Sequence, residues 1–146
     1  MAMPDKQCKD CAAEGVSTRR PTPHPGPRCT THHRAVRRAR KVRAHELHVE
    51  NVYGITGNEY RELYDDQGGT CFVCQRAKGL SKKLAVDHEH NKPGCDHEPD
   101  VGCRNCVRCL ACTTCNQVIL GRYDVDALVR AITVLINPPA QRILNA

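Results

Sequence analysis

Residues 84–116 carry the motifs around which the chain is expected to fold, and Leu84 is followed by Ala85-Val86-Asp87-His88-Glu89-His90. This stretch closes with Cys112-Thr113-Thr114-Cys115-Asn116. An apolar strand therefore leads directly into side chains that bind metal or carry protons, and an asparagine directly follows a CxxC pair. A second CxxC pair, Cys71-Phe72-Val73-Cys74, lies upstream. Two such pairs supply the four thiolates that tetrahedral zinc prefers, which predicts a zinc site. Its expected ligands are Cys71, Cys74, Cys112 and Cys115.

The composition predicts that metal sites hold much of the chain together. With 146 residues the chain is long enough for one domain, or for one domain with a small appendage. It has no tryptophan, four tyrosines and one phenylalanine, so a conventional apolar core would be thin. Its eleven cysteines compensate, and their CxxC spacing is typical of zinc ligands rather than of disulfides.

The apolar segments argue against a secreted or membrane protein. Residues 1–10 lack the apolar centre of a signal peptide, and the longest apolar run, residues 131–136, is too short to span a bilayer. We therefore expect no membrane partner and a cytoplasmic protein whose thiols are reduced.

Positive charge is concentrated in the first third of the chain. Residues 1–50 carry 11 Lys and Arg against 5 Asp and Glu, whereas residues 51–146 carry 11 of each, so the whole formal charge of +6 belongs to the first part. This asymmetry predicts a polyanionic partner that the N-terminal part meets first.

The N-terminal unit, residues 1–33, has the pattern of a zinc knuckle. A CxxC pair and a CxxH pair flank the proline-rich segment 21–27, which cannot be helical and is expected to form a loop. The expected zinc ligands are Cys8, Cys11, Cys29 and His32. His33 is an alternative to His32, and an unstructured thiol-bearing tail is the alternative to a metal site.

Residues 34–52 form the second expected unit, a basic helix or linker. The segment 34–49 has no proline or glycine and is rich in arginine and alanine, which predicts a helix. Four basic residues at positions i, i+3, i+4 and i+7 share one face and could follow a phosphate backbone: Arg34, Arg37, Arg38 and Lys41. The alternative is a solvated basic face. Because no aromatic residues interleave with the stripe, we expect phosphate contacts without sequence preference.

Between the predicted strand and the last CxxC pair lies an insertion with its own possible metal ligands. A CxH pair and a CxxC pair make this third candidate zinc site, whose ligands would be Cys95, His97, Cys103 and Cys106. Cys109 is not assigned to any of these sites and is expected to be either a packed thiol or an alternative ligand. The sequence thus predicts between one and three structural zinc ions.

Helices and one more strand are expected around these sites. A helix over residues 58–67 would bury Tyr60, and residues 107–111 would return as the second strand of a hairpin. A helix should then start at Thr113 and end near Gly121, and a final helix over residues 125–136 should follow the N-cap Asp124. The apolar stripe of this last helix either closes the core or packs against a second subunit.

Taken in order, these motifs resemble the recombination endonuclease VII family, whose members are HNH nucleases with a ββα-metal core. The resemblance rests on CFVC, AVDHEH, VRCLACTTCN, LGRY and NPPAQRIL, and covers roughly residues 53–144. It implies an HNH domain over residues 53–146 that is helical in its C-terminal part. Together with the N-terminal zinc knuckle, which precedes this domain, the expected fold is a small zinc-stabilised α+β fold. The family commonly has a glutamate in the helix after the asparagine, where this chain has Gln117.

The chemistry expected of this site is phosphodiester hydrolysis. A hard cation such as Mg²⁺ or Mn²⁺ prefers oxygen ligands, which Asp87 and Asn116 provide. His88 can then act as the general base, since imidazole titrates near neutral pH. His90 follows two residues later and would lie on the same side of an extended strand. Asp87 and His88 would point to opposite faces of a regular strand, so the strand must twist or end there. The resemblance implies the same roles for these four residues.

Three functions are compatible with the sequence. The first is a metal-dependent endonuclease that cuts DNA, with branched DNA such as four-way junctions as the substrate that the family name implies. Paired cuts in a junction would require a homodimer. The second is a nicking or DNA-packaging HNH endonuclease, and the third is a zinc-finger DNA-binding protein without catalytic activity. The third gives no reason for Asp87, His88 and Asn116 to occur together.

Overall fold

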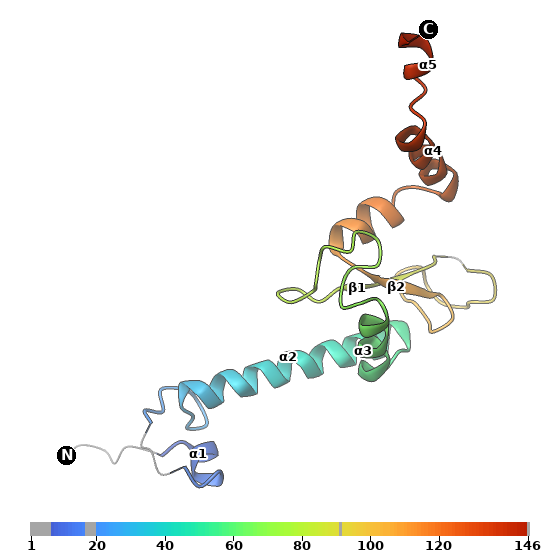
Figure 1. Cartoon of the computed structure of the whole chain (residues 1–146). Helices are drawn as coiled ribbons and strands as arrows, with labels where there is room; N and C mark the ends of the chain where they lie inside the picture. The colour runs from blue at the N-terminus through green and yellow to red at the C-terminus, as the bar shows by residue number, and fades with distance from the viewer. Residues whose placement is uncertain (1–6, 17–19, 91, 146) are drawn as a thin grey trace.

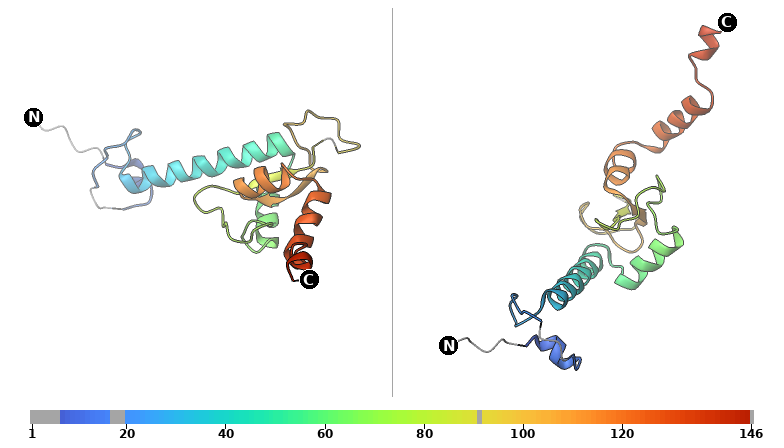
Figure 2. Two further views of the ribbon diagram at one scale, coloured as in Figure 1. Left: turned by 90° about the horizontal axis from the view of Figure 1, so that it is seen from above. Right: turned by 60° about the vertical axis from the view of Figure 1, so that its left-hand side comes forward.

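The computed structural model describes residues 7–16, 20–90 and 92–145, which form several helices and one small hairpin (Figure 1). The elements are α1 (Lys9–Ala13), α2 (Thr30–Tyr53), α3 (Gly57–Asp66), β1 (Ala85–His88), β2 (Val107–Ala111), η1 (Cys115–Leu120), α4 (Val125–Ile136) and α5 (Gln141–Leu144). The shape is elongated. α1 lies beside the start of the long helix α2, the hairpin lies beyond its other end, and α4 and α5 continue away from it (Figures 1 and 2).

The predicted small α+β class is therefore observed, with a sheet of two strands. Within the described ranges, none of the helices is both long enough and apolar enough to cross a lipid bilayer.

Helix α2 is longer than the predicted segment 34–49 at both ends. It begins directly after Cys29, so His32 lies in its first turn. It ends at Gly54, which adopts a left-handed conformation with φ 65° and donates its backbone N–H to the carbonyl of Glu50 at 3.0 Å. Glycine reaches this conformation without steric penalty, which explains the position of the helix end. Val49 is the buried residue of the helix, so most of α2 projects away from the core.

Helix α3 joins the end of α2 to the hairpin. Thr56 and Glu59 form a reciprocal capping box at its start. Tyr60 is buried, as predicted, and its hydroxyl donates to the carbonyl of Leu84 at 2.8 Å. At the end of the helix the side chain of Gln67 pairs with both backbone groups of Leu110, at 2.9 and 2.8 Å. Gln67 therefore satisfies polar groups at the edge of β2 that a third strand would otherwise have to satisfy.

The hairpin pairs β1 with β2 in antiparallel register, with Val86 opposite Leu110 and Asp87 opposite Cys109. The register then shifts, because His88 pairs with Val107 and leaves Arg108 as the additional residue of β2. Such a bulge bends the strand and increases its twist. The second strand has the predicted bounds, 107–111.

The main core is small and contains cysteine sulfur as well as hydrocarbon. Leu110 and Val49 are among its largest fully buried side chains, and Cys71 and Cys115 belong to the same cluster. Cys109 also lies in this cluster and in none of the possible ligand groups of the described ranges. Burial raises the pKa of its thiol to about 11. Of the two predicted roles for Cys109, a packed thiol is the one that the structure supports.

After the hairpin the chain forms η1, a π-helix that ends at Gly121 as predicted. Helix α4 has the predicted bounds, and the carboxylate of Asp124 accepts the backbone N–H of Ala127 at 2.7 Å as its N-cap. Its apolar stripe does not close the core of this chain: α4 has no buried residue, and Val125 and Leu135 are 76% and 82% exposed.

Candidate nuclease site and its zinc-ligand groups

The two central CxxC pairs come together as a group of four cysteines. Backbone N–H groups orient the sulfurs: the N–H of Cys112 lies 3.2 Å from Cys71 Sγ, and that of Cys115 lies 3.5 Å from Cys112 Sγ. The Sγ atoms of Cys74 and Cys112 are 4.0 Å apart, and all four sulfurs lie within 4.8 Å of one another. Zinc with Zn–S bonds of about 2.3 Å would separate tetrahedral sulfurs by about 3.8 Å, so the group fits zinc.

The thiols of this group differ strongly in acidity. Hydrogen bonds from the backbone of Arg76 and Ala77 lower the pKa of Cys74 to about 6. The pKa of Cys115 is raised, chiefly by burial and then by the neighbouring sulfurs. Burial and the neighbouring sulfurs thus oppose a negative charge on Cys115, and a bound divalent cation would compensate that charge.

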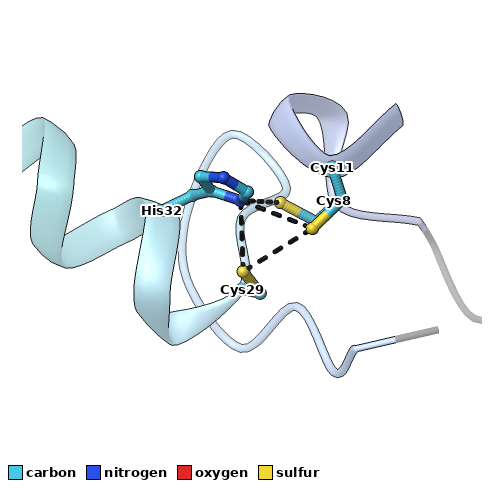
Figure 3. A group of neighbouring side chains, drawn as sticks. All are labelled: Cys8, Cys11, Cys29 and His32. Carbon is cyan, nitrogen blue, oxygen red and sulfur yellow. Dashed lines mark hydrogen bonds between the residues drawn. The ribbon is translucent and has the colours of Figure 1, made fainter. Parts of the chain in front are cut away.

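The N-terminal group of Cys8, Cys11, Cys29 and His32 also comes together (Figure 3). Nδ1 of His32 lies 3.4, 3.4 and 3.3 Å from the three sulfurs. Its Nε2 lies 3.0 Å from the carboxylate of Glu14, the kind of outer contact that fixes the tautomer of a zinc-ligating histidine. His33 stacks instead on His24, with ring centroids 4.1 Å apart. His32, not His33, is therefore the member of this group.

The third group brings together Cys95, His97, Cys103 and Cys106. The Sγ atoms of Cys95 and Cys103 lie 3.4 Å apart, and Cys106 Sγ lies 3.5 Å from Nε2 of His97. Nδ1 of the same histidine lies 3.1 Å from the carbonyl of Glu98. That contact places the proton on Nδ1 and leaves Nε2 free as a ligand.

A pocket of about 370 Å³ contains all four residues predicted to carry the chemistry, Asp87, His88, His90 and Asn116. Asp87 and His88 are buried at the end of β1, and Asn116 lies on η1 directly after the zinc-ligand candidate Cys115. The ring centroids of His88 and His90 are 4.5 Å apart, which agrees with the prediction that they share one side.

The bulge between Asp87 and His88 explains how two successive residues reach the same pocket. In a regular strand their side chains would point to opposite faces, but the register shift reorients one of them. The bend that the sequence required at this point is therefore present.

Arg108, the additional residue at the bulge, forms a two-pronged ion pair with Asp87. Its Nε and Nη2 atoms lie 2.6 and 3.1 Å from the two carboxylate oxygens. The carboxylate is buried, whereas the arginine is 43% exposed. Hydrogen bonding to Asp87 raises the pKa of Arg108, and burial together with the charge of Asp87 raises the pKa of Tyr53, which also lines the pocket. A guanidinium thus neutralises the candidate metal-ligating carboxylate.

The insertion contributes Asp100 to the lining of the pocket and contacts both histidines through a backbone group. The carbonyl of Pro99 lies 3.2 Å from Nε2 of His88 and 2.9 Å from Nδ1 of His90. This contact could not be predicted, because every residue carries a backbone carbonyl.

The predicted basic stripe of α2 is a continuous surface. Arg34, Arg37, Arg38 and Lys41 line one shallow hollow of about 300 Å³. A larger hollow, of about 530 Å³, lies elsewhere, between the loop 76–84 and residues 112–114. Its lining carries four basic side chains and no acidic one: Arg76, Lys78, Lys82 and Lys83. Their clustering was not foreseen, although their close spacing in the sequence was a usable signal.

Comparison with known proteins agrees with the resemblance seen in the sequence. A Gene 59 protein of Mycobacterium phage L5 is 45% identical over 142 residues, which cover 96% of this chain and 79% of that protein. A Gene 59 protein of Mycobacterium phage D29 is similar to the same extent. No solved structure matches the chain significantly.

The sequence model of recombination endonuclease VII matches residues 46–137. The match begins in the last two turns of α2 and includes the hairpin, the four central cysteines and α4. Because it covers the larger part of the sequence, the chain belongs to the recombination endonuclease VII family.

Proposed function

We propose that this protein is a metal-dependent HNH endonuclease that hydrolyses phosphodiester bonds in DNA. The observation that carries the proposal is the convergence of a buried carboxylate, an amide and two imidazoles on one pocket beside a four-cysteine group. Membership in the endonuclease VII family supports the nuclease class. The strand order β1, β2 and then η1 is compatible with a ββα-metal core.

The pocket suits a hard divalent cation. Asp87 and Asn116 offer a carboxylate and an amide oxygen, the donor types that Mg²⁺ and Mn²⁺ prefer, and they leave room for water and phosphate. Such an ion, when bound, neutralises charge on the phosphate and on the leaving oxygen. Arg108 would leave the carboxylate as the ion binds and would remain at the edge of the pocket as a phosphate contact.

His88 is proposed as the general base. Since the carbonyl of Pro99 accepts a hydrogen bond from Nε2, the proton belongs on Nε2 and Nδ1 remains free to take a proton from water. His90 contacts the same carbonyl through Nδ1, so its Nε2 is the free nitrogen, available to the phosphate or to the leaving group. One carbonyl thus gives the two rings opposite tautomers.

The basic surfaces are proposed to bind the phosphate backbone. The α2 stripe and the hollow lined by Arg76, Lys78, Lys82 and Lys83 supply two separate positively charged surfaces. Neither hollow has an aromatic lining residue, which favours phosphate contact over base stacking. We assign residues 1–33 to the knuckle, 34–52 to the basic arm and 53–146 to the nuclease domain.

Structural zinc is proposed at the three Cys/His groups, which implies action in a reducing compartment such as the cytoplasm. A homodimer is proposed because α4 presents an apolar stripe that this chain does not cover. Two active sites in one dimer would allow paired cuts in branched DNA.

The decisive experiment combines one substitution with two substrates. The protein and its His88→Ala variant are incubated with Mg²⁺ and either a labelled four-way junction or a linear duplex of matched sequence. We expect the variant to cleave at least a hundredfold more slowly while it binds DNA equally well, because only the base is removed. Undiminished cleavage would exclude His88 from the mechanism.

The substrates separate the remaining alternatives. Preference for the junction supports structure selectivity, equal cleavage of both favours a nicking or packaging-associated enzyme, and binding without cleavage by the wild-type protein favours a non-catalytic zinc-finger protein. Cleavage by the unmodified protein must also depend on Mg²⁺ or Mn²⁺.

A further inference from the structure

The insertion between the strands forms a closed loop whose two ends meet at a metal-ligand group. Cys95 and His97 come from its first half, and Cys103 and Cys106 come from its second half. The separations of 3.4 and 3.5 Å between ligand atoms are close to those of a tetrahedral zinc site. Zinc here would therefore fix residues 98–102, which the ligands enclose.

The enclosed segment touches both imidazoles of the pocket. Pro99 presents its carbonyl to His88 and His90, at 3.2 and 2.9 Å. Gly102 lies directly behind the His88 ring: a Cβ added to Gly102 would approach His88 Cγ to 3.2 Å and Tyr53 Cδ1 to 2.7 Å. The loop backbone thus contacts the ring of His88 at Pro99 and approaches it closely at Gly102.

The outer side of the loop is held by the helices and by β1. The backbone N–H of Gly102 donates to the carbonyl of Val52 at 2.9 Å, and that of Glu89 donates to the carbonyl of Cys106 at 2.9 Å. Arg104 pairs with Glu59 of α3 and donates to the carbonyl of Gly54 at 3.2 Å. These contacts fix the ends of the loop. Pro99 itself lies in a turn that is closed by the hydrogen bond from the backbone N–H of Val101 to the carbonyl of Glu98 at 3.0 Å, and this turn directly follows His97 of the Cys/His group.

We propose that a zinc ion bound by Cys95, His97, Cys103 and Cys106 positions the carbonyl of Pro99 and thereby sets opposite tautomers on His88 and His90. The role of this zinc ion in catalysis rests on the proposed nuclease function. The loop is then a positioning device for the two histidines. It differs from the four central cysteines, which hold the hairpin against η1.

The carbonyl can select the tautomer of each ring because its hydrogen bonds are directional. A neutral imidazole has one N–H, and a strong acceptor opposite one ring nitrogen keeps the proton there. When the acceptor moves away, each ring becomes free to exchange its proton between both nitrogens and to rotate. Loss of comparable outer contacts to site histidines lowers activity by roughly ten- to a hundredfold.

The test compares Cys95→Ser, which removes a zinc ligand, with His97→Cys, which keeps four ligands as a Cys₄ set. Native mass spectrometry counts the zinc ions, and long-range ¹H–¹⁵N spectra of the histidine rings report the tautomers. The spectra are recorded well above the ordinary titration range of imidazole. We expect the wild-type protein and His97→Cys to show Nε2–H on His88 and Nδ1–H on His90. Cys95→Ser should lose one zinc ion and show averaged tautomers on both rings.

Cleavage gives the second readout. We expect the kcat of Cys95→Ser to fall roughly ten- to a hundredfold, with KM for DNA unchanged, because the loop adds no DNA contact in this proposal. His97→Cys should cleave like the wild type. If Cys95→Ser does not fold, His97→Ala serves as the zinc-losing variant, since three cysteines remain.

The outcomes separate the inference from the proposed function. Opposite tautomers that persist in a zinc-losing variant would overturn the inference, as would their loss in a His97→Cys variant that retains zinc. If the wild type cleaves no DNA while its tautomers follow zinc occupancy, the nuclease proposal fails and the positioning proposal stands.

Discussion

The central and the N-terminal cysteine groups have similar ligands but different connections to the rest of the molecule. The central group contributes Cys71 and Cys115 to the main apolar core, in the same cluster as Leu110. The N-terminal group is its own core, because its three cysteines cluster with partly buried Val16 beside the start of α2. One group is embedded in the fold, and the other is attached to it by a helix.

Because of this difference, the two metal ions would stabilise different parts of the structure. The central group joins the loop at residues 71–74 to the start of η1, and η1 carries Asn116 into the pocket. The pocket should therefore form only when the central cysteine group is intact. The N-terminal group is joined to the core through α2, so its loss should disturb the arm and leave the pocket intact.

We expect the largest effect when one cysteine ligand is removed from either group. Cys115→Ser removes a ligand from the central group, and Cys11→Ser does the same to the N-terminal group. Structural zinc contributes about 10–16 kcal/mol of apparent binding energy, comparable with the whole stability of a domain, about 5–15 kcal/mol. We therefore expect Cys115→Ser to lose the cooperative thermal transition of the central domain, whereas Cys11→Ser keeps it. Circular dichroism melting and zinc content of both variants measure this.

Two results would contradict the comparison. One is a Cys115→Ser protein that melts like the wild type with one zinc ion fewer. The other is a Cys11→Ser protein that has lost the central transition, since the knuckle would then be part of the same folding unit.

A smaller effect concerns the ion pair inside the pocket. Arg108→Gln leaves the buried Asp87 carboxylate without its charged partner, so the metal-free protein should lose about 1–3 kcal/mol of stability. Mn²⁺ should then bind several-fold more tightly than to the wild type, because no guanidinium competes for the carboxylate. Melting with and without Mn²⁺ and calorimetric titration measure both effects.

Arg122→Gln, the same change at an exposed residue, is the matched control and should alter neither quantity. If Arg108→Gln binds Mn²⁺ with unchanged affinity, the arginine does not compete with the cation and Asp87 is not a ligand of Mn²⁺.

Features with local signals could be predicted from the sequence. The CxxC, CxxH and CxH spacings identified the members of all three possible ligand groups, because such spacings keep two ligands close together. The expectation of a returning hairpin strand before the last CxxC pair gave the bounds of β2, and the cap residue Asp124 gave the start of α4. The apolar face of α4 was also recognisable, but its exposure was not, since a sequence pattern does not show what covers a face.

Features that depend on register or on backbone groups could not be predicted. Arg108 meets Asp87 only because one residue is added to β2 at the bulge, and the hydrophobic pattern is the same with or without it. Pro99 acts through a carbonyl, which every residue has. The end of α2 was also missed, although Gly54 was a usable stop signal.

The smallest expected effect sharpens the role of the arm. Arg37→Ala combined with Arg38→Ala removes two charges from the stripe of α2, whereas Arg40→Ala combined with Arg43→Ala removes two charges beside it. Each phosphate contact adds about 0.9 to the slope of log K against log salt concentration, so the first pair should flatten this slope by roughly one to two units. The second pair has the same effect on net charge and should leave the slope nearly unchanged. Fluorescence anisotropy with a duplex, in Ca²⁺ to prevent cleavage, measures the slopes. Equal flattening by both pairs would show that the arm attracts DNA through its net charge alone, and unchanged slopes for both would show that α2 does not contact phosphate.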